Sequence, residues 1–330
     1  FEESLIGYKQ YLQLPTASEV PEFANSYYNL AYTYFKLKKY SEAITNFDEY
    51  VLNSSADATR KKDAYLRLGD SYFVTSEYWP AMDNYNAAIE ISPLNNDYAK
   101  FQKAISYGFV DRVDSKVEAL KTFIEDYSNS IYRDDALYEL GNTYVAQDIA
   151  NKAISAYDLL AVQHPKSIFV PKSLLKKALI LDNSGESDEA LQIFKRVAEE
   201  YPATNEALQA VASAKIIYID QGSVEAYASW VQTLDFIDIE DAELDDATYQ
   251  AAERPYLENK VGQAQSRLED YLERFPEGNH VLPAHFYLGQ IYFDDGNNDA
   301  AIPHYAFTVS KEGSEFTEQA LARISELYLT

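Results

Sequence analysis

The chain has 330 residues, 47% of them hydrophobic, which is enough to bury a sizeable core. Its 53 acidic residues outnumber 28 basic ones, and the formal charge of −25 argues against nucleic-acid binding because a phosphate backbone would be repelled over most of the surface. The absence of cysteine excludes disulfides, thiolate nucleophiles and cysteine-ligated metals, and no apolar run is long enough to predict a membrane span.

A repeat of 35 to 38 residues runs through the chain and is marked by a small residue that recurs eight times. Twelve residues after each small residue, seven of the eight repeats have Ala and one has Lys116. Apolar residues around both positions follow helical spacing, so each repeat is predicted to be a pair of helices. The small positions are Ala31, Gly69, Ala104, Gly141, Ala178, Ala214, Ala252 and Gly289.

In chain order, residues 1–15 are predicted to form the second helix of a truncated repeat. Six helix pairs follow over residues 22–240 and two more over 241–315, and residues 316–330 form a first helix without its partner. An array that starts and stops inside a repeat would expose apolar faces at its ends. We therefore expect a longer natural protein, or a partner or end-to-end self-association that covers those faces.

Large side chains stand sixteen residues after each small residue, at Phe47, Tyr85, Leu120, Tyr157, Phe194, Trp230, Leu268 and Tyr305. Two helices cross closely only where the residues at the crossing are small, so larger side chains are expected to fill the space beside the crossing. Pro93, Pro165, Pro202 and Pro276 are expected to follow the ends of second helices. Pro255 lies inside a predicted first helix, which we expect to kink or to be interrupted.

These residues resemble the tetratricopeptide repeat (TPR) family, whose pattern is met almost completely by Tyr65, Leu68, Gly69, Tyr72, Ala81, Tyr85, Ala88 and Pro93. The resemblance implies an all-α fold, a right-handed superhelical array of antiparallel helix pairs, in which first helices line a concave face. Residues 123–145 and 271–292 are similar to segments of bacterial cell-envelope TPR proteins, namely outer-membrane-assembly lipoproteins and Tol-associated periplasmic coordinators. That similarity implies a location in the cell envelope or periplasm, although the sequence shows no targeting signal.

The resemblance also implies which residues face the groove, three before and one after each small residue. From these columns we select ten groove-binding candidates: Tyr28, Tyr32, Asp70, Phe101, Tyr138, Asn142, Tyr249, Glu253, Phe286 and Gln290. Aromatic anchors beside polar acceptors suit an extended peptide or a partner helix, although the same rings could pack between repeats. The family's carboxylate clamp needs Lys and Asn here, and Asp63 and Asp70 have the wrong charge, so a basic or apolar-aromatic partner fits better.

Motifs for catalysis are absent from the sequence, which has no phosphate loop, nucleophile elbow or dinucleotide fingerprint. No cofactor or metal is expected. Residues 294–299 suggest a calcium loop but lack its ligand order, and His285 stands at a packing position, so a two-histidine metal site is the minor alternative. Residues 235–246 carry seven carboxylates and are interpreted as a solvated joint, with a divalent-cation or basic-partner site as the alternative.

The sequence therefore predicts a non-enzymatic scaffold that binds a peptide or partner protein in its concave groove. One alternative is a structural spacer or assembly module acting through its end helices. Another is a carbohydrate- or peptidoglycan-binding module, because the 29 tyrosines offer stacking faces with hydroxyl groups.

Overall fold

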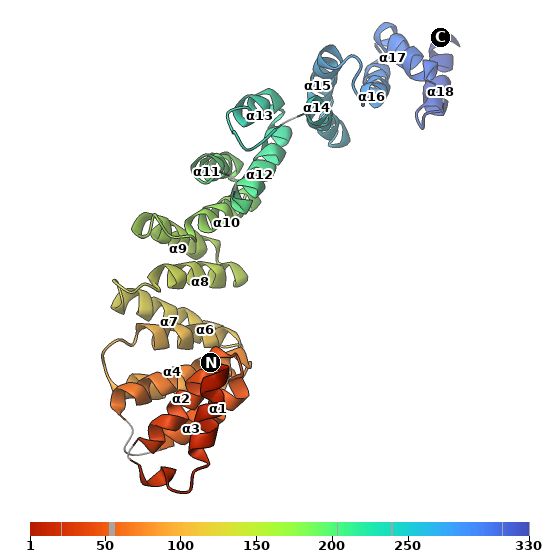
Figure 1. The fold of residues 1–330 in the computed structure, drawn as a ribbon. Coiled ribbons are helices and arrows are strands. Elements are labelled where there is room, and N and C mark those ends of the chain that lie inside the picture. Colours follow the sequence, from red (N-terminus) through yellow and green to blue (C-terminus); the bar gives the residue numbers. More distant parts are fainter. Residues whose placement is uncertain (21, 53–56, 203, 239, 312, 330) are drawn as a thin grey trace. The chain divides into compact units, whose positions relative to one another are not determined.

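The computed structural model describes residues 1–20, 22–52, 57–202, 204–238, 240–311 and 313–329. Over these residues every regular element is helical, and the chain divides into two compact units, Phe1–Ser173 and Leu174–Thr330 (Figure 1). The all-α solenoid of helix pairs predicted from the sequence is confirmed. The division between the two units falls inside a helix, at Ser173 and Leu174.

Unit 1 contains nine α-helices and one short 3-10 helix among its described residues, and each α-helix packs on the next. They are α1 (Glu2–Leu12), η1 (Ala17–Glu19), α2 (Phe23–Lys36), α3 (Tyr40–Leu52), α4 (Ala58–Val74), α5 (Tyr78–Ile91), α6 (Asp97–Gly108), α7 (Val113–Asp126), α8 (Arg133–Ala146) and α9 (Ala150–Gln163).

Unit 2 begins within α10 (Val170–Asn183). In this unit the first helix of one repeat contacts the first helix of the next, as α12 contacts α14 and α14 contacts α16. Its other helices are α11 (Ser187–Glu200), α12 (Asn205–Gln221), α13 (Val224–Val231), α14 (Asp241–Leu257), α15 (Val261–Arg274), α16 (Val281–Asp294), α17 (Asn298–Ser310) and α18 (Thr317–Leu329).

The turn inside each pair has the same backbone form in all eight repeats. One residue adopts the left-handed conformation, for example Ser76 with φ 65° and Gly296 with φ 75°. The next residue donates its N–H to a carbonyl five residues earlier, as in Glu77 to Tyr72 at 2.8 Å, which satisfies a carbonyl that the helix end leaves open. The predicted prolines follow the second helices as expected: α5 ends at Ile91 before Pro93, and α15 ends at Arg274 before Pro276.

All eight small residues are buried. At the three glycines, the side chain packed closest comes from the second helix of the same pair. A Cβ atom built on Gly141 would lie 2.3 Å from the ring of Tyr157, and one on Gly69 would lie 2.5 Å from the ring of Tyr85. Gly289 stands in the same relation to Tyr305. Glycine occurs where the opposing side chain is Tyr, and Ala occurs where it is Phe, Leu or another residue, so the pair is matched in volume.

The alignment of one repeat is wrong. Ala226 is exposed, whereas Tyr227 and Val231 are buried. The left-handed residue of the turn before α13, Gly222, stands eight positions after Ala214 where the other repeats have seven, because one extra residue lies in α12 before the turn, so every equivalent position in α13 moves by one.

The predicted interruption at Pro255 does not occur, because α14 continues to Leu257. Proline lacks the N–H that would reach the carbonyl of Ala251. Arg267 of α15 supplies the missing donor: its Nη1 donates to the Ala251 carbonyl at 2.9 Å, and its Nη2 donates to the Gln221 carbonyl at 2.9 Å. A residue from the second helix thus replaces the backbone hydrogen bond.

We expect Gly141→Ala to lower stability by about 1–3 kcal/mol because the added methyl overlaps the Tyr157 ring. Adding Tyr157→Leu, the partner used with Ala104 and Ala252, should recover part of the loss. The stabilities of the wild type, the two single variants and the double variant are measured by thermal unfolding, followed by circular dichroism. Gly262→Ala is the control, because nothing lies within 4 Å of its Cβ position and stability should rise slightly. Additive effects of the two substitutions would contradict direct packing.

Arg267→Ala should destabilise the protein by about 1–3 kcal/mol because it leaves the Ala251 carbonyl without a donor. In a Pro255→Ala background the new N–H can bond that carbonyl, so the same Arg267 substitution should cost less. Denaturant unfolding of the wild type, the two single variants and the double variant gives the coupling free energy between Arg267 and Pro255. An equal cost in both backgrounds would show that Arg267 does not compensate for the proline.

Candidate functional site

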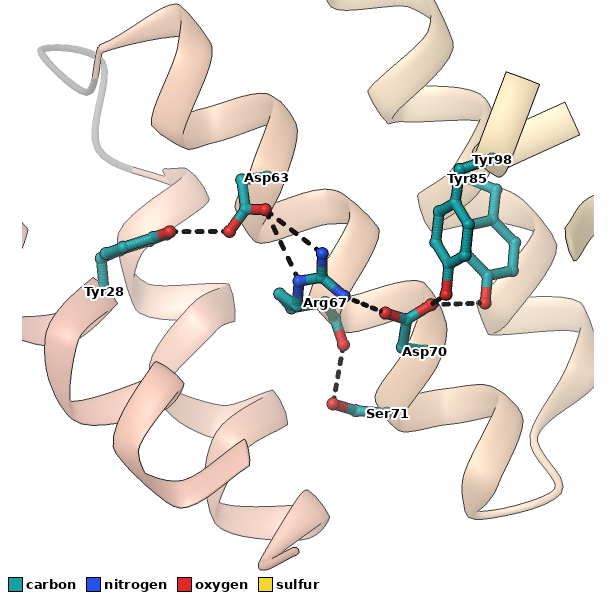
Figure 2. Close-up of polar contacts among 7 residues, drawn as sticks. All are labelled: Tyr28, Asp63, Arg67, Asp70, Ser71, Tyr85 and Tyr98. Atoms are coloured by element: carbon teal, nitrogen blue, oxygen red, sulfur yellow. Dashed lines mark hydrogen bonds and ion pairs between the residues drawn. The ribbon is translucent and has the colours of Figure 1, made fainter. Parts of the chain in front are cut away.

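A cluster of polar side chains joins three first helices of unit 1, and we call it the α4 cluster: Tyr28, Asp63, Arg67, Asp70, Tyr85 and Tyr98 (Figure 2). Tyr28 of α2 donates to Asp63 at 2.6 Å. Arg67 lies between Asp63 and Asp70, with its Nη1 2.6 Å from Asp70 and its Nε 3.5 Å from Asp63. Asp70 also accepts from Tyr85 of α5 at 3.0 Å and from Tyr98 of α6 at 2.6 Å.

The cluster has two carboxylates for one guanidinium, which leaves one negative charge. Burial raises the pKa of Asp70, although its hydrogen bonds to Tyr98 and Tyr85 and the charge of Arg67 oppose that rise. Burial also disfavours the charge of Arg67, but Asp70 and Asp63 outweigh it and raise the pKa of the guanidinium. Burial and the hydrogen bond to Asp63 raise the pKa of Tyr28, so this tyrosine remains a neutral donor.

The sequence places the three charged residues of α4 on one face, because Asp63, Arg67 and Asp70 stand at spacings of four and three. Two aromatic rings of α2 lie beside them. Tyr32 stacks on Tyr28 with ring centroids 6.1 Å apart, and Arg67 lies over the ring of Phe35 at 5.6 Å. The side chains of Asp63 and Arg67 stay about a third exposed, at 33% and 27%, so the cluster can be reached from solvent.

Several predicted groove residues are occupied in packing between repeats. Phe101, Tyr249 and Phe286 are 8%, 5% and 5% exposed. Each ring stacks on a ring that precedes the next first helix: Phe101 on Tyr132, Tyr249 on His280, and Phe286 on Phe316, with centroids 5.7, 4.3 and 4.7 Å apart. Tyr138, which is partly exposed, stacks on Phe169 in the same way at 4.8 Å.

The residue after each glycine also has a role inside its own repeat. Asp70 and Asn142 each accept a hydrogen bond from the tyrosine that packs on the glycine, at 3.0 Å from Tyr85 and 3.0 Å from Tyr157. Gln290 holds the same position and is buried; its Nε2, like the hydroxyl of Tyr305, has no hydrogen-bond partner among the described residues. Glu253 accepts from Tyr249 at 2.7 Å.

Among the described residues, the predicted aromatics of the first repeat have no stacked ring from the following joint. Tyr28 and Tyr32 are partly exposed, and Tyr28 bonds Asp63 instead. Sequence reasoning missed Arg67 and Tyr98 as members of the cluster. The i, i+4, i+7 spacing of Asp63, Arg67 and Asp70 was the available signal, whereas nothing local to Tyr98 shows that it reaches Asp70 across a repeat boundary.

The acidic joint is tied to its neighbours by residues near its end. Asp245 is buried, accepts from the Tyr271 hydroxyl at 2.6 Å and accepts from the Asn279 backbone N–H at 2.6 Å. Glu243 pairs with Lys215 of the preceding repeat at 2.7 Å. Over the described ranges no three His, Asp or Glu side chains are placed to hold a metal ion. The calcium-like segment forms the α16–α17 turn, where Asn297 caps the N–H of Ala300 at 3.3 Å.

Two histidines of unit 2 contact each other between α16 and α17. The Nδ1 atoms of His285 and His304 lie 2.8 Å apart, which requires one ring to donate and the other to accept. His285 stacks on Phe307 at 3.9 Å and His304 on Tyr292 at 5.6 Å. Burial and then His304 lower the pKa of His285 to about 4, and burial lowers the pKa of His304 although Glu269 opposes it.

Where the chain is described, no helix combines the length and apolar character that a bilayer crossing needs. The described surfaces of the two units thus consist of helical faces with one reachable polar cluster and several apolar grooves.

Acid should weaken unit 2 through the histidine pair. Between pH 6.5 and 4 an unfolded histidine binds a proton that folded His285 rejects, so stability rises with pH in this window and is lost as pH falls through it. His285→Leu should show a smaller drop in melting temperature over the same range. Parallel melting curves for the two proteins would contradict this assignment.

Comparison with known proteins identifies the repeats. Family models described as tetratricopeptide repeat match residues 24–54, 135–167, 172–204 and 258–306. These segments coincide with α2–α3, α8–α9, α10–α11 and α15–α17. No curated protein matches the chain.

Solved structures of helical repeat proteins resemble the chain at low identity. MamA is 18% identical over 56% of this chain and 98% of its own, with a TM-score of 0.47. A tetratricopeptide repeat protein from Parabacteroides merdae is 13% identical over 82% of this chain and 99% of its own, with a TM-score of 0.43. YrrB, described as a TPR protein with an unusual peptide-binding site, is 19% identical over 58% and 94%, with a TM-score of 0.45. The family-model matches identify tetratricopeptide repeats in these four segments of the chain.

Proposed function

We propose that this chain is a non-enzymatic scaffold that binds an extended peptide of a partner protein across the α4 cluster. Tetratricopeptide repeats generally mediate protein–protein interaction and are typically non-catalytic, which supports the class. The observation that carries the proposal is the reachable, net-negative cluster of Asp63, Arg67 and Asp70 beside the rings of Tyr32 and Phe35.

The chemistry of the cluster favours a basic or aromatic peptide. A cationic side chain of the peptide would neutralise the carboxylate that Arg67 does not balance. A planar side chain of the peptide would pack on the ring of Tyr32, which Lys36 already contacts at 5.2 Å from the ring centroid. The polar groups are fixed by one another before binding, so little side-chain entropy is lost when a peptide arrives.

We place the protein in a bacterial cell envelope, on the similarity of residues 123–145 and 271–292 to envelope TPR proteins. Fractionation of cells that produce the native protein tests this placement, and recovery with the cytosol alone would overturn it.

The binding proposal is tested with a labelled dodecapeptide that alternates Lys and Phe, and with its Glu–Phe counterpart. The basic peptide should bind more tightly, and Asp63→Asn should weaken it by about three- to tenfold because the Tyr28 bond survives while the charge is lost. Glu189→Gln removes the same charge from an exposed position on α11 and is the matched control. Fluorescence anisotropy measures both.

Equal losses for Asp63→Asn and Glu189→Gln would mean that only the net charge attracts the peptide, and the α4 cluster would not be the site. Circular dichroism confirms that both variants keep the helical fold.

A further inference from the structure

Unit 1 also has a groove of opposite character, which we call the α7–α9 groove. It encloses about 460 Å³ and is lined by residues of α7, α8 and α9, which follow one another in the stack of Figure 1. None of the ten predicted groove residues lines it. It is therefore distinct from the α4 cluster.

The floor of the α7–α9 groove is apolar. Leu137, Leu140 and Tyr144 line it at spacings of three and four, which places them on one face of α8. Ile124 lines the α7 side and Leu159 the α9 side. Leu159 is 37% exposed and Val162, three residues on, is 78% exposed, so the apolar strip extends along α9 beyond the pocket.

Three basic side chains, Lys121, Arg133 and Lys152, line the α7–α9 groove together with one acidic side chain, Glu125. Arg133 donates to the Ile124 carbonyl and contacts Gln163 and His164, and Lys152 lies 5.5 Å from the Tyr144 ring centroid. Within the described part of the chain, neither cation has a carboxylate at ion-pair distance. Lys121 pairs only with Glu118 of its own helix, at 3.5 Å and exposed to solvent.

In a chain with 53 acidic and 28 basic residues, a basic side chain is expected to have a carboxylate nearby, so Arg133 and Lys152, which are unpaired among the described residues, set this groove apart. Lys100 and Lys103 line the neighbouring groove over α6 with Ile89 and Phe123, alongside Glu118. Lys100 pairs with Asp126 at 4.0 Å. Lys103 has only an aromatic contact, to Tyr107 at 5.9 Å. A basic, apolar surface thus extends from α5 to α9.

We infer that the α7–α9 groove binds an amphipathic helix of a partner protein whose apolar stripe is flanked by acidic residues. A helix satisfies its own backbone hydrogen bonds and needs only an apolar face for burial between two helices. The walls, α7 and α9, have 14 residues each, so they match about four turns of a bound helix. Its carboxylates would pair with Arg133 and Lys152, which have no carboxylate partner among the residues that the structure describes.

The test uses the whole chain and two designed 14-residue helical peptides that share a Leu stripe and carry either Glu or Lys on its flanks. The Glu peptide should bind, with an affinity that falls as salt is raised. Lys121→Glu/Lys152→Glu should weaken it at least tenfold. Lys39→Glu/Lys166→Glu makes the same charge change at exposed positions outside the groove and should weaken it less than threefold.

Equal binding of the Glu and Lys peptides, or equal losses in the two double variants, would overturn the inference. Decanoate is titrated as a second probe. Saturable binding of decanoate without binding of the Glu peptide would also overturn the helical partner and would identify a small anionic amphiphile instead. Asp63→Asn should leave the Glu peptide unaffected, which separates this site from the α4 cluster.

Discussion

The contact on which every repeat depends is the one between the small residue of a first helix and the side chain packed on it from the second helix. This contact sets how closely the two helices of a pair approach. The smaller Gly141 stands opposite the larger Tyr157, and the larger Ala104 stands opposite the smaller Leu120, so the combined volume of the two side chains stays similar. The left-handed residue in each turn, such as Ser76, brings the second helix back onto the first in the same register. The spacing of surface residues along each unit follows from this repeated geometry.

The same contact also decides which polar residues remain available to a partner. A tyrosine over glycine carries a hydroxyl into the pair, and burial requires a hydrogen-bond acceptor there. Asp70 and Asn142 fill that requirement and are partly committed to structure. The α4 cluster remains reachable because Asp63 and Arg67 extend the network away from Tyr85 toward Tyr28 of α2, which is partly exposed.

The sequence predicts the period, the helix pairs and the prolines that follow second helices, since these depend on local spacing within one repeat. Contacts between two repeats do not follow from this spacing. Phe101 and Tyr249 occupy the predicted column but are covered by Tyr132 and His280 from irregular joints. The register of α13 shifts because α12 carries one extra residue before the turn at Gly222. Compensation of Pro255 by Arg267 likewise depends on a contact between two helices, which periodicity does not encode.

Net charge is a weak guide to partners in a repeat protein because each repeat presents its own surface. A charge of −25 argues against anionic partners only if the charge is evenly spread. At 0.15 M ionic strength, charges beyond about 8 Å are largely screened, so a ligand in the α7–α9 groove responds mainly to Lys121, Arg133 and Lys152. The acidic character of the rest of the chain then steers such a partner away from other surfaces and toward this one. Because the α4 cluster is net negative and the α7–α9 groove is basic, unit 1 would be able to bind two chemically different partners at once.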